Sequence, residues 1–239
     1  MGRKKTFLII DTETTQTDKV ADFGAAVVDK HGNVLAQCGV LLREFYLDSD
    51  NHPLFHSRDA DPLWGRANLP KRYENYSQMI TRGDRMLATV PAVNRWLAKV
   101  AVQYRPTLTA YNLAFDKSKC RNSGIDLDIF ETSFCLWHAA AAKWGKTKAY
   151  RQFVLDTVGF NKPTALGNMS YHTNAEIMAR FAMNSPELPD EPHTALEDIL
   201  DYEHPVLTAL VRNTPPADYM NPPGYNWRDF QVKGNFKPA

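Results

Sequence analysis

The sequence has few cysteines and no long apolar run. Its three cysteines, Cys38, Cys120 and Cys135, are too few and too scattered for a disulfide framework or a zinc cluster, so we expect reduced thiols. No stretch approaches the length of a membrane span, and Met1 to Lys5 leads into a predicted strand rather than into the apolar core of a signal peptide. We therefore expect a cytoplasmic protein with no membrane partner.

An excess of charge of one sign is also missing. The 28 basic side chains nearly balance the 27 acidic ones, which gives a formal net charge of +1. This balance neither supports nor excludes a nucleic-acid partner, because a local basic stripe is enough to hold phosphates. The sequence has no internal repeats or low-complexity tracts, and its 239 residues are enough for one substantial domain with insertions.

Apolar runs and helical periodicities divide most of the chain. Phe7–Glu13, Val20–Asp29 and Val34–Leu42 predict three successive strands that form an antiparallel meander, with turn residues between the last two. Two further strands are predicted at Thr107–Tyr111 and within Phe130–Leu136. Helices are predicted at Met86–Gln103, Trp137–Lys143, Tyr150–Val158, Thr173–Met183 and His193–Val211.

Two segments lack a clear period. Residues 43–85 are polar and rich in aromatic side chains, and we interpret them as an insertion, partly helical near Tyr76–Ile80, that borders the active cleft. Beyond Arg212 the composition shifts to Asn, Pro, Tyr and Gly. The sequence thus predicts a main domain of residues 1–212 and a tail of residues 213–239, which we expect to pack on the main domain rather than to form a partner-binding arm.

Two carboxylates follow the first predicted strand. Side chains alternate along a strand, so Asp11 and Glu13 project to one side while Thr12 points away. Two adjacent negative charges are unfavourable without a cation, and oxygen ligands suit a hard divalent ion such as Mg²⁺ or Mn²⁺. An isolated pair of this kind is more commonly a solvated turn, so a metal site requires further acids.

Further acids occur in two later segments, Asn112–Asp116 and His193–Asp198, each near a strand end or a helix start. In an open sheet such ends gather at one edge, where sites are built. Four carboxylates there can hold two divalent ions that bind the attacking and leaving oxygens of a phosphodiester. His193 can accept a proton from the attacking water. When metal is saturating, we expect its pKa within about a unit of 6.5, because the helix start and the carboxylates act in opposite directions and bound metal offsets much of the carboxylate charge.

The ordered set of Asp11–Thr15, Asn112–Asp116 and His193–Asp198 resembles the three motifs of the DEDDh 3′–5′ exonucleases, in the DnaQ-like, ribonuclease H-like superfamily. The resemblance covers about Phe7 to Val211 and implies an α/β fold with a mixed sheet flanked by helices. It also implies two divalent ions, Mg²⁺ or Mn²⁺. The metal ligands that it implies are Asp11, Glu13, Asp116 and Asp198. The general base that it implies is His193.

The function that this resemblance implies is hydrolysis of single-stranded nucleic acid, with DNA favoured, from its 3′ end to nucleoside 5′-monophosphates. Two alternatives are a 3′–5′ exoribonuclease and a catalytically weak nucleic-acid-binding adaptor on the same fold. The intact carboxylate set disfavours the adaptor, whereas DNA and RNA differ at the sugar 2′ position. The chain departs from the family at Gln16, where glycine is frequent, and in its long insertion. Both adjoin the expected place of a 3′-terminal nucleotide.

Other residues receive less specific predictions. Phe23 and Phe115 are expected in the core. Glu197 and Asp201 are expected to face solvent or basic neighbours. Surface charges are predicted at Asp18, Asp22, Asp126, Asp128 and Glu131. The insertion offers a surface for stacking bases and binding phosphates, with a solvated face as the alternative: Arg58, Trp64, Arg66, Lys71, Arg72, Tyr73, Tyr76, Arg82 and Arg85.

Overall fold

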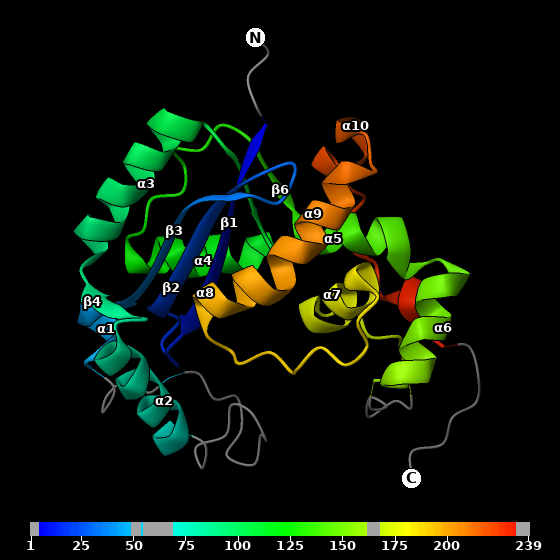
Figure 1. Ribbon diagram of the computed structural model, residues 1–239, viewed down its shortest axis with the longest axis horizontal. Coiled ribbons are helices and arrows are strands. Elements are labelled where there is room, and N and C mark those ends of the chain that lie inside the picture. Colours follow the sequence, from blue (N-terminus) through cyan, green and yellow to red (C-terminus); the bar gives the residue numbers. More distant parts are fainter. Residues whose placement is uncertain (1–4, 49–53, 55–68, 162–167, 233–239) are drawn as a thin grey trace.

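A computed structural model describes residues 5–48, 54, 69–161 and 168–232 of the chain. Across these ranges six strands form one sheet in the order β4-β3-β2-β1-β5-β6 (Figure 1). The β1–β2 and β2–β3 pairs are antiparallel, and the other three pairs are parallel. The predicted mixed sheet of an α/β fold is thereby confirmed. The strands are β1 Thr6–Thr14, β2 Val20–Asp29, β3 Val34–Leu42, β4 Met86–Ala88, β5 Thr107–Ala110 and β6 Ser133–Cys135.

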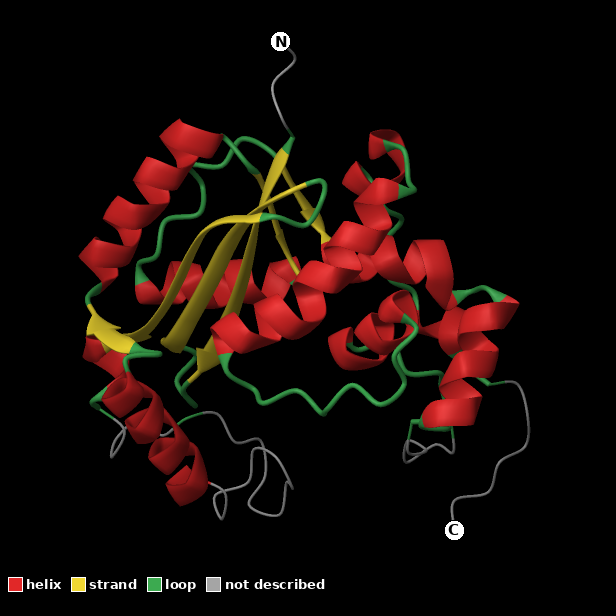
Figure 2. Cartoon of the chain, viewed as in Figure 1, coloured by secondary structure: helices red, strands yellow, loops and turns green. Residues whose placement is uncertain are grey.

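Helices cover both faces of the sheet, in front of and behind the strands (Figure 2). On one face, α5 (Leu136–Ala140), α7 (Ala175–Met183) and α9 (His204–Arg212) pack on Phe7 and Ile9. On the other face, α3 (Val90–Tyr104) and α4 (Leu113–Ser123) pack on Leu8 and Ile10. This double burial explains why β1 is a continuous apolar run.

The alternation of β1 also directs its polar end. Asp11 and Glu13 continue the row of Phe7 and Ile9, so they point to the face covered by α7, α9 and the short helix α8 (Ala195–Asp198). Thr12 continues the row of Leu8 and Ile10 and points to the face of α4. The end of one strand therefore reaches the elements that carry the second and third motifs.

The prediction of a single helix at Met86–Gln103 is wrong. Met86–Ala88 is strand β4, which pairs in parallel with Val40–Leu42 at the sheet edge. The helix begins at Val90, because the Thr89 hydroxyl accepts a hydrogen bond from the Ala92 amide and a proline lies in the first turn. A strand of three residues is too short to show a periodic pattern. The sequence therefore did not distinguish it from the helical pattern that follows.

In its described residues, the predicted insertion contains the helices α1 (Arg43–Tyr46) and α2 (Leu69–Arg82), so its helical part is longer than Tyr76–Ile80. Tyr76 and Met79 of α2 are buried against Leu41 and Leu54. Residues 49–53 and 55–68 of this segment lie outside the described ranges.

The tail contributes helix α10 (Pro216–Met220) and a 3₁₀ turn at Trp227–Phe230. Tyr219 packs edge-on against Phe7 and on Phe134, with ring centroids 6.2 and 5.3 Å away. The remaining helical elements are α6 (Lys148–Thr157) and π-helical turns at Ala141–Gly145 and Ile199–Glu203. None of the helices in the described ranges is both long and apolar enough to cross a membrane.

Candidate active site

A cavity of about 860 Å³ opens beyond the carboxyl ends of the parallel strands β1 and β5. Its lining includes all five residues that the sequence singles out, from three segments far apart in the chain: Asp11, Glu13, Asp116, His193 and Asp198. We call this cavity the carboxylate pocket. Its position agrees with the general rule that α/β proteins bind ligands beyond the carboxyl ends of their parallel strands.

Three of these residues form a close group. One ligand atom from each of Glu13, His193 and Asp198 lies within 4.8 Å of the other two. Asp116 is 3% exposed and accepts a 2.8 Å hydrogen bond from the Thr12 hydroxyl, which ties α4 to the end of β1. Asp11 is half-buried and lines the same pocket.

Burial raises the pKa of every carboxyl group in this set. It raises the pKa of Asp11 to about 7 and, with Asp11 and Glu191 adding repulsion, that of Asp198 to about 10. Glu13 and Asp116 also have pKa values well above the usual range, again chiefly because of burial. The surroundings of each carboxyl group therefore disfavour its ionised form.

The residues fit a hard divalent cation. In the described part of the chain, no Lys or Arg forms an ion pair with Asp11, Asp116 or Asp198. Oδ1 of Asp198 is buried without a hydrogen-bond partner within the same ranges. Carboxylate oxygens beside one imidazole are suitable ligands for Mg²⁺ or Mn²⁺, which would satisfy these oxygens and reduce the repulsion.

His193 precedes its helix rather than starting it. The helix α8 begins at Ala195, and His193 has a φ of 55°, in the left-handed region. Burial, assisted by the Arg72 guanidinium, lowers the pKa of His193 to about 4. Loss of hydration outweighs the opposing effect of the Asp190 carboxylate, so the imidazole is neutral at pH 7.

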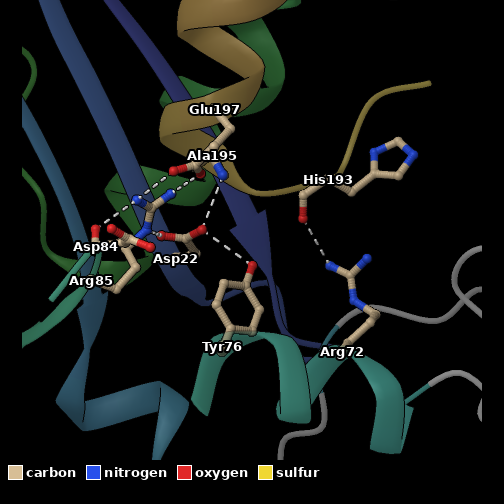
Figure 3. Close-up of polar contacts among 8 residues, drawn as sticks. All are labelled: Asp22, Arg72, Tyr76, Asp84, Arg85, His193, Ala195 and Glu197. Atoms are coloured by element: carbon tan, nitrogen blue, oxygen red, sulfur yellow. Dashed lines mark hydrogen bonds and ion pairs between the residues drawn. The ribbon is translucent and has the colours of Figure 1, made fainter. Parts of the chain in front are cut away.

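A buried polar cluster holds the first turn of α8 against the sheet (Figure 3). Asp22 of β2 accepts hydrogen bonds from the Ala195 amide at 3.0 Å, from the Tyr76 hydroxyl at 3.2 Å and from Nε of Arg85 at 3.2 Å. The same guanidinium binds both carboxylate oxygens of Glu197. We call these five residues the Asp22 network.

The Asp22 network overturns three predictions. Asp22 was expected at the surface, and Tyr76 and Arg85 on a nucleic-acid-binding face, but all three are buried. A charge can be buried when an opposite charge and hydrogen bonds satisfy it, and this pairing depends on residues far apart in sequence. Glu197 does meet a basic neighbour, as expected.

Two glycines make room for this arrangement. A Cβ at Gly24 would lie 2.5 Å from the carbonyl carbon of Ala195, and one at Gly39 would lie 2.7 Å from Nη1 of Arg85. Both distances are too short for a side chain, so only glycine lets α8 and the guanidinium approach the sheet so closely.

The described residues of the predicted nucleic-acid-binding surface that lie outside the Asp22 network are on α2. Nη2 of Arg72 lies 3.4 Å from Oε2 of Glu13, which lines the carboxylate pocket. The same nitrogen lies 3.4 Å from the His193 carbonyl oxygen (Figure 3). Lys71 and Arg82 are exposed on the same helix. Arg58, Trp64 and Arg66 lie outside the described ranges.

The sequence did not identify several residues of the pocket. Phe115, expected in the core, is 38% exposed and lines the pocket. Trp137 and Tyr225 form an aromatic wall with ring centroids 4.1 Å apart, supported by the Trp137 Nε1 hydrogen bond to the Thr173 hydroxyl. Trp137 and Tyr225 lie far apart in the sequence, so no local sequence pattern predicts this wall.

Two further acids, Glu191 and Glu203, also line the pocket. Burial raises the pKa of Glu191 to about 8. Glu191 lies in the loop before His193, where no period marks it. Glu203 follows Asp198 by five residues. In an ordinary α-helix, two side chains at this spacing point in different directions.

No protein-family model matches the chain, and no curated protein matches it. Among solved structures, the chain is similar to the crystal structure of exonuclease I in complex with the inhibitor BCBP, with 15% sequence identity and a TM-score of 0.46. The match covers 90% of this chain and 43% of that chain, so this chain spans less than half of its length.

Proposed function

We propose that the protein is a metal-dependent 3′–5′ exonuclease that hydrolyses phosphodiester bonds of single-stranded nucleic acid, with DNA favoured, and releases nucleoside 5′-monophosphates. One observation carries this proposal. Asp11, Glu13, Asp116, Asp198 and His193, from three segments of the chain, line one pocket. Their order and identity are those of the three exonuclease motifs that the sequence resembles.

The carboxylates and the histidine have separate roles. Asp11, Glu13, Asp116 and Asp198 would hold two Mg²⁺ or Mn²⁺ ions, which supply positive charge for the attacking and leaving oxygens. His193, neutral at pH 7, accepts the proton of the attacking water at a ring nitrogen. The Asp22 network orients this segment through the Ala195 amide.

The shape and lining of the pocket support a strand end as the substrate. Its volume of about 860 Å³ lies within the range of small-molecule sites and suits a terminal nucleotide. Phe115, Trp137 and Tyr225 offer aromatic faces on which bases can stack.

The experiment compares 5′-labelled single-stranded DNA, duplex DNA and RNA of one sequence in Mg²⁺, Mn²⁺ or EDTA. We expect a ladder of shortened single-stranded DNA and nucleoside 5′-monophosphates with either cation, and no products in EDTA. A closed single-stranded circle should survive. Faster loss of RNA would favour the exoribonuclease, cleavage of the circle an endonuclease, and binding without degradation the adaptor.

A further inference from the structure

The helix that carries Asp198 changes its winding immediately after this residue. Residues five apart in an α-helix lie about 140° apart around the axis, because each residue turns about 100°. Ile199–Glu203 is instead a π-helical turn, in which the His204 amide donates to the Ile199 carbonyl oxygen. Such an i→i+5 bond brings residues five apart toward the same side of the helix. Asp198 and Glu203 consequently both line the carboxylate pocket.

Glu203 is buried with one carboxylate oxygen unsatisfied. The residue is 4% exposed, and its Oε1 accepts a 3.3 Å hydrogen bond from the Tyr111 amide, just after β5. Its Oε2 is buried and has no hydrogen-bond partner within the described ranges. A buried carboxylate oxygen is unfavourable in this state and requires a cation or a proton.

The charged groups that act most strongly on Glu203 are acidic. Asp11 from β1 and Asp116 from α4 raise its pKa, as do Glu191 and Asp198, although burial is the largest cause. No Lys or Arg in the described part of the chain pairs with Glu203. The side of the pocket near Asp11 and Asp116 thus holds a third carboxylate without a basic partner.

We propose that Glu203 is a fifth carboxylate ligand, which forms a second cation site with Asp11 and Asp116 beside the group of Glu13, His193 and Asp198. This inference rests on the proposed metal-dependent function and specifies how the chain holds its second ion. Affinity for a hard cation rises with the number of charged ligands, so the second ion binds the free protein before any nucleic acid arrives.

The test uses Glu203→Gln, which removes the charge but keeps an oxygen for the Tyr111 amide. Binding of Mn²⁺ to the full chain without nucleic acid is measured by isothermal titration calorimetry. We expect two sites in the original protein, and in the variant a weaker site that loses at least about tenfold in affinity. The other site should change less than about twofold, since its ligands remain. Asp201→Asn, an exposed acid in the same π-helical turn, is the matched control and should bind like the original protein.

Folding of the variant is checked separately. In EDTA its thermal midpoint should equal or exceed that of the original protein, because the variant buries a neutral amide in place of an ionisable carboxyl group. If Glu203→Gln fails to fold, Glu203→Asp, which keeps the charge but retracts the carboxylate, must weaken the same site. Unchanged affinity of both sites in the folded variant overturns the inference.

The outcomes also separate this inference from the proposed function. Degradation of single-stranded DNA by a protein that binds one Mn²⁺ overturns the second site alone. Two Mn²⁺ sites, one of them dependent on Glu203, in a protein that degrades no nucleic acid support this inference and overturn the proposed function. A protein that binds no cation overturns both.

Discussion

Among single residues, Asp116 shows how burial and function conflict. Its carboxylate is 3% exposed, accepts one hydrogen bond from Thr12 and has a pKa well above its usual range. Such a group makes the free protein less stable, unless a cation binds it.

Asp116→Asn keeps an oxygen for the Thr12 hydroxyl and removes the charge. We expect kcat in Mg²⁺ to fall by at least about 10³-fold, because a lost ligand removes several kcal/mol of transition-state stabilisation. The thermal midpoint in EDTA should not fall. Asp126→Asn, at an exposed position, is the control for both measurements. Near-normal turnover in Asp116→Asn would show that Asp116 is not a ligand and that the three-motif hypothesis is wrong.

His193 can act as a base or as a ligand, because its ring lies close to Glu13 and Asp198. If His193 acts as a base, His193→Gln should lower kcat by about 10² to 10⁴ and leave the Mn²⁺ affinity nearly unchanged. With a pKa of about 4, the imidazole is already neutral at pH 6, so it should contribute no rise in rate between pH 6 and 8. Parallel losses of kcat and Mn²⁺ affinity would identify a ligand instead.

At the scale of elements, the position of α8 depends on charges in other parts of the fold. Asp22 lies on β2, Tyr76 on α2, and Arg85 just before β4, and together they contact the first turn of the helix that carries Asp198. The Asp22 network therefore fixes the position of the third motif relative to the sheet and to α2.

Arg85→Met should lower the free energy of unfolding by about 3–5 kcal/mol, because it leaves the Asp22 carboxylate buried without its cation. Adding Asp22→Asn should recover part of this loss, since the unpaired charge is then removed. Glu197→Gln should cost about 1 kcal/mol or less, because the Glu197 side chain is 32% exposed. Urea unfolding in a double-mutant cycle measures all three. A loss below about 1 kcal/mol in Arg85→Met would contradict the assigned role of this ion pair.

At the scale of the whole molecule, the acidic pocket couples folding to pH and to cations. The pKa of Asp11 is raised to about 7, that of Glu191 to about 8 and that of Asp198 to about 10. The folded state therefore holds protons that the unfolded chain releases near pH 4. Their contribution to stability is complete below the unfolded pKa and disappears as the pH rises through the folded values.

His193 acts in the opposite direction, because its lowered pKa makes stability rise with pH between about 4 and 6.5. Above pH 6.5 only the carboxyl effect remains. In EDTA we therefore expect a lower thermal midpoint at pH 8 than at pH 6.5. Saturating Mn²⁺ should raise the midpoint at pH 8 and remove most of this difference, because it binds the ionised carboxylates. Equal midpoints in EDTA at the two pH values would contradict the pKa shifts.

The sequence alone determined the features that depend on neighbouring residues. The alternation and turns in residues 7–42 predicted the β1–β3 meander, and the apolar run before Asp11 placed two carboxylates on one face of a strand. The order of the three motifs was sufficient to select Asp116, His193 and Asp198, which the fold then brings to one pocket. Hydrophobic periodicity and strand geometry are local, so they can be read along the chain.

Tertiary structure decided the features that depend on distant partners. Asp22 can be buried because partners distant in sequence satisfy it, among them Arg85, 63 residues later. Phe115 is exposed because the pocket opens beside it. Glu203 faces the pocket because the helix winds as a π-turn, which no α-helical period predicts. The free energy of a buried charge and the winding of a packed helix depend on the atoms around them, and the fold alone brings those atoms together.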